Sequence, residues 1–474
     1  MTTDLSQIEP ESEKLSFLTK LAYGAGDMGP AITANVLVFF LLPFFTDVAG
    51  ISAGLAGSIL MVSKISDALN DPVVGFLSDR TRHPWGRRYP WIVFGGIPFG
   101  IIFCLQWVVP GFSEWGLFCY YVAIGVLFNI AYTAVSLPYT ALTPELTKDY
   151  NERTNLNSFR FAFSIGGSIL SLVLATFIFS QVQDTGQRYL VLGIVCTVIS
   201  VLPLHLCVWG TRKRVAAVQR LRVEDPEDSE ASLSLPEQLR VAFSNRPFLF
   251  VIGIYLCSWL AVQVIGSVMK YFVVDLMGLE PQIFPQVALT VQGTAFLMLF
   301  VWTRVSDRFG KKAVYYMGTA LWLIAQIILL YLQPGQVGLM YFLAVIAGCG
   351  VAVAYLVPWS MLPDVIDLDE LRTAQRREGV FYAFMVLLQK LGLAIGLFLV
   401  GQALDWSGYI ETVAGEPIPV QPDSALLAIR LSVAVLPAIC LLGGIVLAYF
   451  YPITREVHAD ILLQLRERQQ QDDL

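Results

Sequence analysis

Long apolar stretches, each about as long as a membrane is thick, recur from one end of this chain to the other. Two of them cover 187–209 and 426–451, and short polar segments separate them. Roughly 20 apolar residues cross a bilayer as a helix, and a helix satisfies its own backbone polar groups inside hydrocarbon. Only 14% of the 474 residues are charged, against roughly 25% in a typical soluble domain. We therefore expect an all-α membrane protein with twelve transmembrane helices.

The longest polar interruption lies near the middle of the chain, at 210–246. It is rich in charged residues and poor in aromatic ones, which is typical of a linker between domains. The sequence therefore predicts a six-helix bundle over 22–209 and a second one over 247–452. Polar tails are expected at 1–21 and 453–474.

Lysine and arginine are concentrated in alternate connections between the apolar stretches. These connections hold Arg80, Arg82, Arg87, Arg88, Lys148, Arg153, Arg212, Lys213, Arg214, Arg220, Arg222, Arg240, Arg246, Arg304, Arg308, Lys311, Lys312, Arg372, Arg376 and Arg377. Short loops that face the cytoplasm are enriched in Lys and Arg. We therefore predict that both termini and the linker are cytoplasmic.

Two basic connections repeat the same motif at matching places in the two halves. Each reads Ser-Asp-Arg followed by glycine and two basic residues, at 78–88 and at 306–312. Parallel repeats of this kind are typical of transporters that rock two halves around a central site, although two basic loops can also resemble each other by chance. If the repeat is real, we expect the Asp-Arg pair of each motif to act in conformational gating. These residues are Asp79, Arg80, Asp307 and Arg308.

A few charges fall inside the apolar stretches, where each costs at least about 2.5 kcal/mol at mid-bilayer. Lys64, Asp67 and Asp71 are three and four residues apart, so they share one helix face. Two carboxylates one turn apart suit a cation such as Na⁺, or one of them takes a proton. The alternative is a salt-bridge network that only holds helices together. Lys390, deep in a later stretch, needs a carboxylate partner or an anionic substrate.

Other polar residues in the spans allow two interpretations each. Asp27 can lie at the rim of the membrane or contact substrate. A hydroxyl at Thr133 or Ser136 can complete a cation shell or bond to its own helix. Lys270 lies near the end of its span, where we expect its ammonium to reach the interface by snorkelling.

At these residues the chain resembles the glycoside–pentoside–hexuronide:cation symporter family, the melibiose-permease group of the major facilitator superfamily. The resemblance covers nearly the whole chain. The segments that carry it are 20–27, 45–50, 67–75, 87–91, 137–139, 151–154, 361–364 and 377–379. It implies the major facilitator fold, with twelve helices in two six-helix halves that open alternately to the two sides of the membrane.

The resemblance also implies roles for residues that match the family motifs. Asp67, Asp71 and Thr133 match the ligands of the coupling cation, Na⁺ or H⁺, and Lys390 matches the lysine of span 11. No further cofactor is expected.

The substrate residues match the family less closely. Lys64 stands where the family carries an arginine, and Arg160 matches an arginine beside the sugar pocket. The two acids that hold galactosides in the melibiose permease are replaced by Ala31 and Ser136. Asp27, one turn before Ala31, is a candidate substitute for the first of them.

We therefore predict a symporter that couples cation entry to uptake of a sugar, glycoside or sugar acid. The alternative cargo is a lysophospholipid or a similar amphiphile, because the chain also resembles the lysophosphatidylcholine symporters of the same group, in which the matching lysine faces a phosphate. No nucleophile–His–acid set or phosphate loop is visible, so an enzyme is not expected. We expect a monomer in a bacterial cytoplasmic (inner) membrane, whose partners are the lipid bilayer and a small molecule, with no nucleic acid.

Overall fold

A computed structural model describes residues 15–147, 150–221, 235–373, 375, 377–411 and 419–472 of the chain. Most of the predicted N-terminal tail, the centre of the predicted linker and the last two residues lie outside these ranges. Every regular element within the described ranges is a helix. The helices are α1 (Phe17–Ala25), α2 (Met28–Asp47), α3 (Ala53–Arg80), α4 (Tyr89–Leu105), α5 (Glu114–Thr140), α6 (Thr143–Leu146), α7 (Tyr150–Gln181), α8 (Thr185–Leu221), α9 (Leu235–Ser244), α10 (Arg246–Lys270), η2 (Tyr271–Leu276), α11 (Ile283–Phe309), α12 (Lys311–Tyr331), α13 (Val337–Thr373), α14 (Glu378–Trp406), α15 (Asp423–Phe450) and α16 (Arg455–Asp472).

Ten helical segments of the described ranges are long and apolar enough to cross a membrane, with α1 and α2 counted together. Two further helices have different compositions. α3 is 28 residues long but carries Lys64, Asp67 and Asp71 within its apolar sequence, and α4 is apolar but only 17 residues long. The charged stretch of α3 is therefore the part of the bundle that a hydropathy criterion alone misses.

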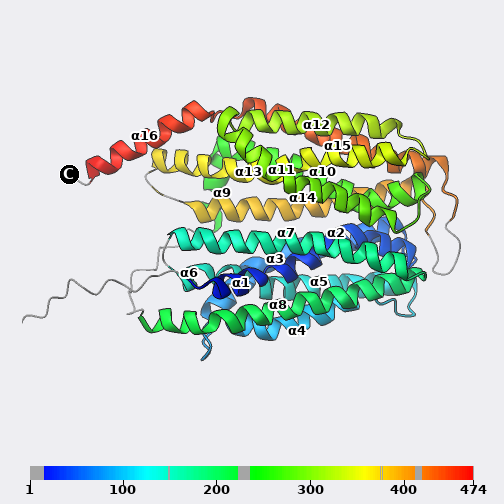
Figure 1. Ribbon diagram of the computed structural model, residues 1–474, viewed down its shortest axis with the longest axis horizontal. Coiled ribbons are helices and arrows are strands. Elements are labelled where there is room, and N and C mark those ends of the chain that lie inside the picture. Colours follow the sequence, from blue (N-terminus) through cyan, green and yellow to red (C-terminus); the bar gives the residue numbers. More distant parts are fainter. Residues whose placement is uncertain are drawn as a thin grey trace, which may run out of the picture.

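The long helices form two groups that lie side by side (Figure 1). α1–α8 make the first group, and α10–α16 with η2 make the second. The groups meet along three helix pairs, in which α3 packs against α14, α2 against α10 and α7 against α11. Any cavity between the groups is therefore lined by residues that are distant in the sequence.

Short connections make consecutive long helices alternate in direction. We call the end at which α3, α11 and α13 finish the basic end, because Arg80, Arg308 and Arg372 lie there. Figure 1 shows α6 and α16 toward this same end. We call the opposite end, where α2 finishes at Asp47 and α10 at Lys270, the closed end.

The crossing of α3 and α14 depends on two glycines near the closed end. A Cβ atom added to Gly401 would lie 2.5 Å from the carbonyl oxygen of Ala53 and 2.8 Å from Cα of Gly57. A Cβ atom added to Gly57 would lie 3.0 Å from Cα of Gly401. Small residues let membrane helices approach until their backbones touch. This contact fixes how deeply side chains of α14 reach toward α3.

We predict that Gly401→Val destabilises the protein, because the added methyl groups meet backbone atoms that cannot rotate away. Overpacking of this kind costs roughly 1–3 kcal/mol. The melting temperature of detergent-purified protein measures the effect. Gly166→Val is the matched control, since a Cβ atom at Gly166 meets nothing within 4 Å. Equal melting temperatures for the two variants would contradict the prediction.

Candidate functional site

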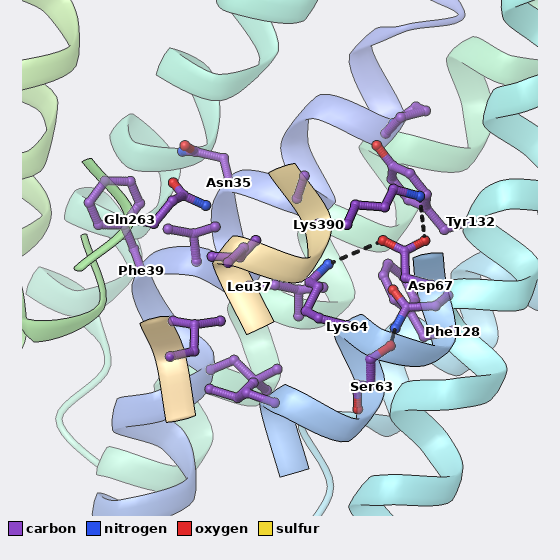
Figure 2. A pocket seen from close by; sticks show the side chains of 18 of the residues that line it. Asn35, Leu37, Phe39, Ser63, Lys64, Asp67, Phe128, Tyr132, Gln263 and Lys390 are labelled. Carbon is purple, nitrogen blue, oxygen red and sulfur yellow. Dashed lines mark hydrogen bonds and ion pairs between the residues drawn. The ribbon is translucent and has the colours of Figure 1, made fainter. Parts of the chain in front are cut away.

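A cavity of about 420 Å³ lies between the two helix groups. Its lining comes from α2, α3, α5 and α7 on one side and from α10, α11, α13 and α14 on the other. More than half of the described lining residues are apolar or aromatic, and the others are amides, serine hydroxyls and four charged side chains. Figure 2 shows Asp67, Lys64 and Lys390 at one part of the wall and Asn35 with Gln263 at another.

Lys390 lies between the two carboxylates that the sequence predicted as a cation site. Its ammonium nitrogen is 2.9 Å from Oδ1 of Asp67 and 2.7 Å from Oδ2 of Asp71. The hydroxyl of Thr133 donates to Oδ1 of Asp71 at 3.0 Å and lies 3.5 Å from Oδ1 of Asp67. The structure therefore brings the predicted acids, hydroxyl and lysine into one cluster. It also gives Lys390 the carboxylate partners that the sequence required of it.

The cluster exists because three helices from different parts of the chain converge. Asp67 and Asp71 are one turn apart on α3, and Thr133 comes from α5. Lys390 comes from α14, which the glycine contact holds against α3. Asp67 is buried, whereas the side chain of Asp71 keeps 29% of its surface exposed. Asp67 and Lys390 line the cavity, whereas Asp71 and Thr133 are not among its lining residues.

Lys64 lies on the same wall but is bound less tightly. Its ammonium is 3.8 Å from Oδ2 of Asp67, beyond hydrogen-bond distance, and a quarter of the side chain is exposed. Figure 2 shows the ammonium of Lys64 close to Asp67, among the side chains that line the cavity. Within the described residues it donates no hydrogen bond, so its N–H groups are available to a ligand.

The remaining predicted substrate residues separate into two sets. Asp27 lines the cavity, and its Oδ2 is 3.6 Å from Nε of Arg160 on α7. Asp27 is therefore part of the cavity wall and not an isolated rim residue. Ser136 lies on α5 one turn beyond Tyr132, and Tyr132 lines the cavity whereas Ser136 does not. The structure thus does not place Ser136 with the other candidates.

Sequence reasoning missed a cluster of amides in the cavity wall. Nε2 of Gln292 on α11 donates to Oδ1 of Asn35 on α2 at 2.7 Å, which joins the two groups. Nδ2 of Asn35 donates to the Ser168 carbonyl and the Ser171 hydroxyl. Gln263 on α10 also lines the cavity, and Figure 2 shows it in the same part of the view as Asn35. The sequence feature that could have predicted this cluster is a single amide side chain in the middle of each of three apolar stretches.

Two further N–H donors of the cavity wall are buried without a partner among the described residues. They are Nε1 of Trp259 on α10 and Nε2 of Gln106, just after α4. A buried donor that is left unpaired costs free energy. Both nitrogens are therefore candidates for hydrogen bonds to a ligand.

The expectation that Lys270 snorkels to the interface is wrong. Lys270 is only 4% exposed, and its ammonium is 2.7 Å from Oδ2 of Asp47 in the other helix group and 3.1 Å from Oδ2 of Asp275. The wider turn of the π-helix η2, which begins at Tyr271, brings Asp275 back beside Lys270. The Tyr409 hydroxyl donates to Asp275 at 3.1 Å. Lys270 stays inside because two buried carboxylates compensate its charge.

Polar contacts also join the start of α3 to the second helix group at this end. The carboxylate of Glu411, in the connection after α14, accepts the backbone N–H of Ala53 at the start of α3. The side-chain amide of Gln402 donates to the carbonyl of Gly54 at 3.0 Å. Burial raises the pKa of Glu411 above its usual value. The first turn of α3 is thus held by the second helix group.

The predicted gating residues of the first group lie at the basic end and not in the cavity. Asp79 forms an ion pair with Arg88, which also donates to the hydroxyl of Ser78 at 2.8 Å. The guanidinium of Arg80 lies 3.9 Å from the ring centroid of Phe76. Glu145, on the short helix α6, accepts from Arg87 at 2.8 Å.

The second group repeats part of this arrangement. Lys311 pairs with Asp364 at 2.7 Å, so the start of α12 is joined to α13 much as the loop after α3 is joined to α6. Asp307 and Arg308 are exposed, and the guanidinium of Arg308 lies 5.4 Å from the ring centroid of Phe309. The basic residues that follow the two Ser-Asp-Arg motifs therefore make similar contacts to acids of neighbouring helices.

Comparisons with known proteins agree with this architecture. Residues 22–455 match the family model described as MFS/sugar transport protein. The uncharacterized symporter sll1374 of Synechocystis sp. is 52% identical over 98% of this chain and 99% of its own length. Sodium-dependent lysophosphatidylcholine symporter 1 of Xenopus tropicalis is 29% identical over 95% of this chain and 90% of its own length.

A solved structure, the crystal structure of a D-xylose-proton symporter, superimposes with a TM-score of 0.63 at 16% identity, covering 92% of this chain and 97% of that one. The likeness covers most of both chains, so the two proteins share the same arrangement of helices. The chain belongs to the MFS/sugar transport protein family and is a multi-pass integral membrane transporter.

Proposed function

We propose that this protein is a secondary active symporter that couples entry of Na⁺ or H⁺ to uptake of a sugar, glycoside or sugar acid. Its two helix groups act as halves, 22–209 and 247–452, with twelve spans in total. The basic end faces the cytoplasm, because Lys and Arg are retained on that side. The bacterial relative that is similar over nearly its whole length supports placement in an inner membrane.

The observation that carries this proposal is the position of Lys390. Its ammonium lies between the carboxylates of Asp67 and Asp71, where a coupling cation would sit. Carboxylate and hydroxyl oxygens are the ligands that hard cations prefer, and Thr133 supplies the hydroxyl. Two adjacent carboxylates repel each other without a positive charge between them. Lys390 thus supplies one positive charge beside the two acids in the absence of the coupling ion.

This exchange gives a physical basis for coupling. Lys390 belongs to the second group and the two acids to the first, so their ion pairs join the halves. A cation that binds the acids releases the ammonium toward the cavity, where it can contact substrate. Cation and substrate then favour the same state of the carrier, and each raises the affinity of the other.

The composition of the cavity supports a sugar-like cargo. Amides such as Asn35 and Gln263 both donate and accept hydrogen bonds, as sugar hydroxyls do. Aromatic side chains including Trp259 and Tyr355 line the same space and offer faces to a sugar ring. The second candidate cargo, a lysophospholipid, is supported by the named relative from Xenopus tropicalis and by the two lysines of the wall.

Alternating access requires the closed end to open. The ion pair between Lys270 and Asp47 joins the halves there, together with the Thr46–Tyr271 hydroxyl pair at 2.9 Å. All of these groups are buried. We propose that this cluster is the gate on the outer side, which must separate and become hydrated when the carrier faces outward.

Asp67→Asn and Asp71→Asn should each remove the dependence of uptake on Na⁺ or pH, because an amide does not compensate a cation. Uptake of a transported sugar into proteoliposomes, with and without a cation gradient, measures this. Asp423→Asn, an exposed acid outside the cluster, is the control and should keep the dependence. Unchanged cation dependence in both cluster variants would refute the proposed mechanism.

Lys270→Gln should open the closed end, because it leaves Asp47 and Asp275 buried without their ammonium. Removing one partner of a buried ion pair costs roughly 3–5 kcal/mol. The opening is measured by labelling a cysteine at Val287→Cys, a buried position of α11 at the closed end, with a membrane-impermeant maleimide. The background carries Cys119→Ser, which removes an exposed native cysteine.

Adding Asp47→Asn to Lys270→Gln removes one of the two stranded acids and should reduce the labelling again. Equal labelling of the parent and Lys270→Gln would show that the cluster does not hold the gate. A variant that is simply unfolded would not be rescued by the second substitution, so the double variant separates the two explanations.

A further inference from the structure

The ionisable side chains around the cavity balance in sign. Three acids and three bases make up the set, and each acid has a basic partner: Asp27 with Arg160, Asp67 with Lys64 and Lys390, and Asp71 with Lys390. The cluster is therefore neutral when neither cation nor substrate is bound.

No other charged side chain of the described residues lines the cavity. The lining includes Asp27, Lys64, Asp67 and Lys390, and its remaining polar members are amides, hydroxyls and indole or phenol groups. Asp71 and Arg160 complete the set through their ion pairs. The balance of the site is thus set by these six residues.

A coupling cation disturbs this balance by one positive charge. Na⁺ adds it directly, and a proton adds it by neutralising a carboxylate. A charge that is buried in a low-dielectric site without compensation is costly. The transporter must nevertheless close around both ligands and carry them across. The free-energy cost of burying the loaded site is therefore lowest when the substrate brings one negative charge.

We propose that the substrate is a monoanionic, carboxylate-bearing sugar, carried together with one cation so that the occluded site is neutral. This inference rests on the proposed function and specifies its cargo. A neutral sugar, or a lysophosphatidylcholine whose phosphate and choline charges cancel, would leave the loaded site with a charge of +1.

The geometry offers the anion a definite place. Lys64 has free N–H groups beside the cavity, and Lys390 gains free N–H groups once a cation takes its position between the acids. The sugar carboxylate would lie at this wall. The hydroxyls would lie toward Gln263, Asn35 and the unpartnered Nε1 of Trp259, which line the same cavity.

Uptake by the full-length protein in proteoliposomes tests the charge of the cargo. The probes are D-glucuronate and D-galacturonate, their neutral counterparts D-glucose and D-galactose, and lysophosphatidylcholine, each with an inward Na⁺ or H⁺ gradient. We expect cation-dependent uptake of an acid sugar at least 10-fold above its neutral counterpart. We also expect that rate to stay the same when valinomycin and K⁺ impose an inside-negative potential.

The outcomes separate the inference from the proposed function. Cation-dependent uptake of a neutral sugar or of lysophosphatidylcholine, accelerated by the inside-negative potential, would overturn the inference and leave the symporter intact. Failure of both acid sugars would also overturn the inference. Cation-independent uptake of every transported probe would instead refute the proposed function.

Lys64→Gln provides a second, independent readout. It lowers the charge of the site by one, so a bound cation alone restores neutrality. The preference for acid over neutral sugar should fall by about 10-fold or more, since hydrogen bonds to charged groups are the stronger ones. Lys64→Arg keeps the charge and should keep the preference. A purely structural role of Lys64 would lower uptake of both sugars equally, which would contradict the inference.

Discussion

The ion pairs of Lys390 with Asp67 and Asp71 are the interaction on which the centre of this molecule depends. Two carboxylates one turn apart on a membrane helix repel each other unless a positive charge lies beside them or one of them takes a proton. The helix that supplies the charge belongs to the other half of the protein. The same contact therefore satisfies the electrostatics of the acids and sets how the two halves meet.

Two other contacts join the halves, and both lie closer to the closed end. Toward the closed end, glycines bring the backbones of α3 and α14 into contact, so that lysine and acids are within reach of each other. At the end itself, Lys270 pairs with an acid from each half, and the π-helix places one of them. At both Lys390 and Lys270, charge is buried only where the opposite charge is present. These ion pairs are therefore strong while they are buried, and they can separate when water enters and solvates the charges.

Much of the central site could be predicted from the sequence, because charges are rare in apolar stretches and therefore conspicuous. Lys64, Asp67, Asp71 and Lys390 stood out in this way, and the structure brings all four together. Ser136 does not lie with them. A hydroxyl can bond to its own helix, so unlike a charge it needs no partner from another helix.

The sequence by itself determined the class of fold, the two-part organisation and the ionisable residues that require a partner, because hydrocarbon penalises every unpaired charge and every unsatisfied backbone group. Only the tertiary structure decided which partner each charge meets. Lys270 shows the difference: its position near a helix end allowed snorkelling, and only the packing of α2 against α10 and η2 revealed two buried carboxylates beside it. The amide cluster of Asn35, Gln263 and Gln292 likewise appears only when three helices converge, since neutral polar groups show their role through the geometry they share.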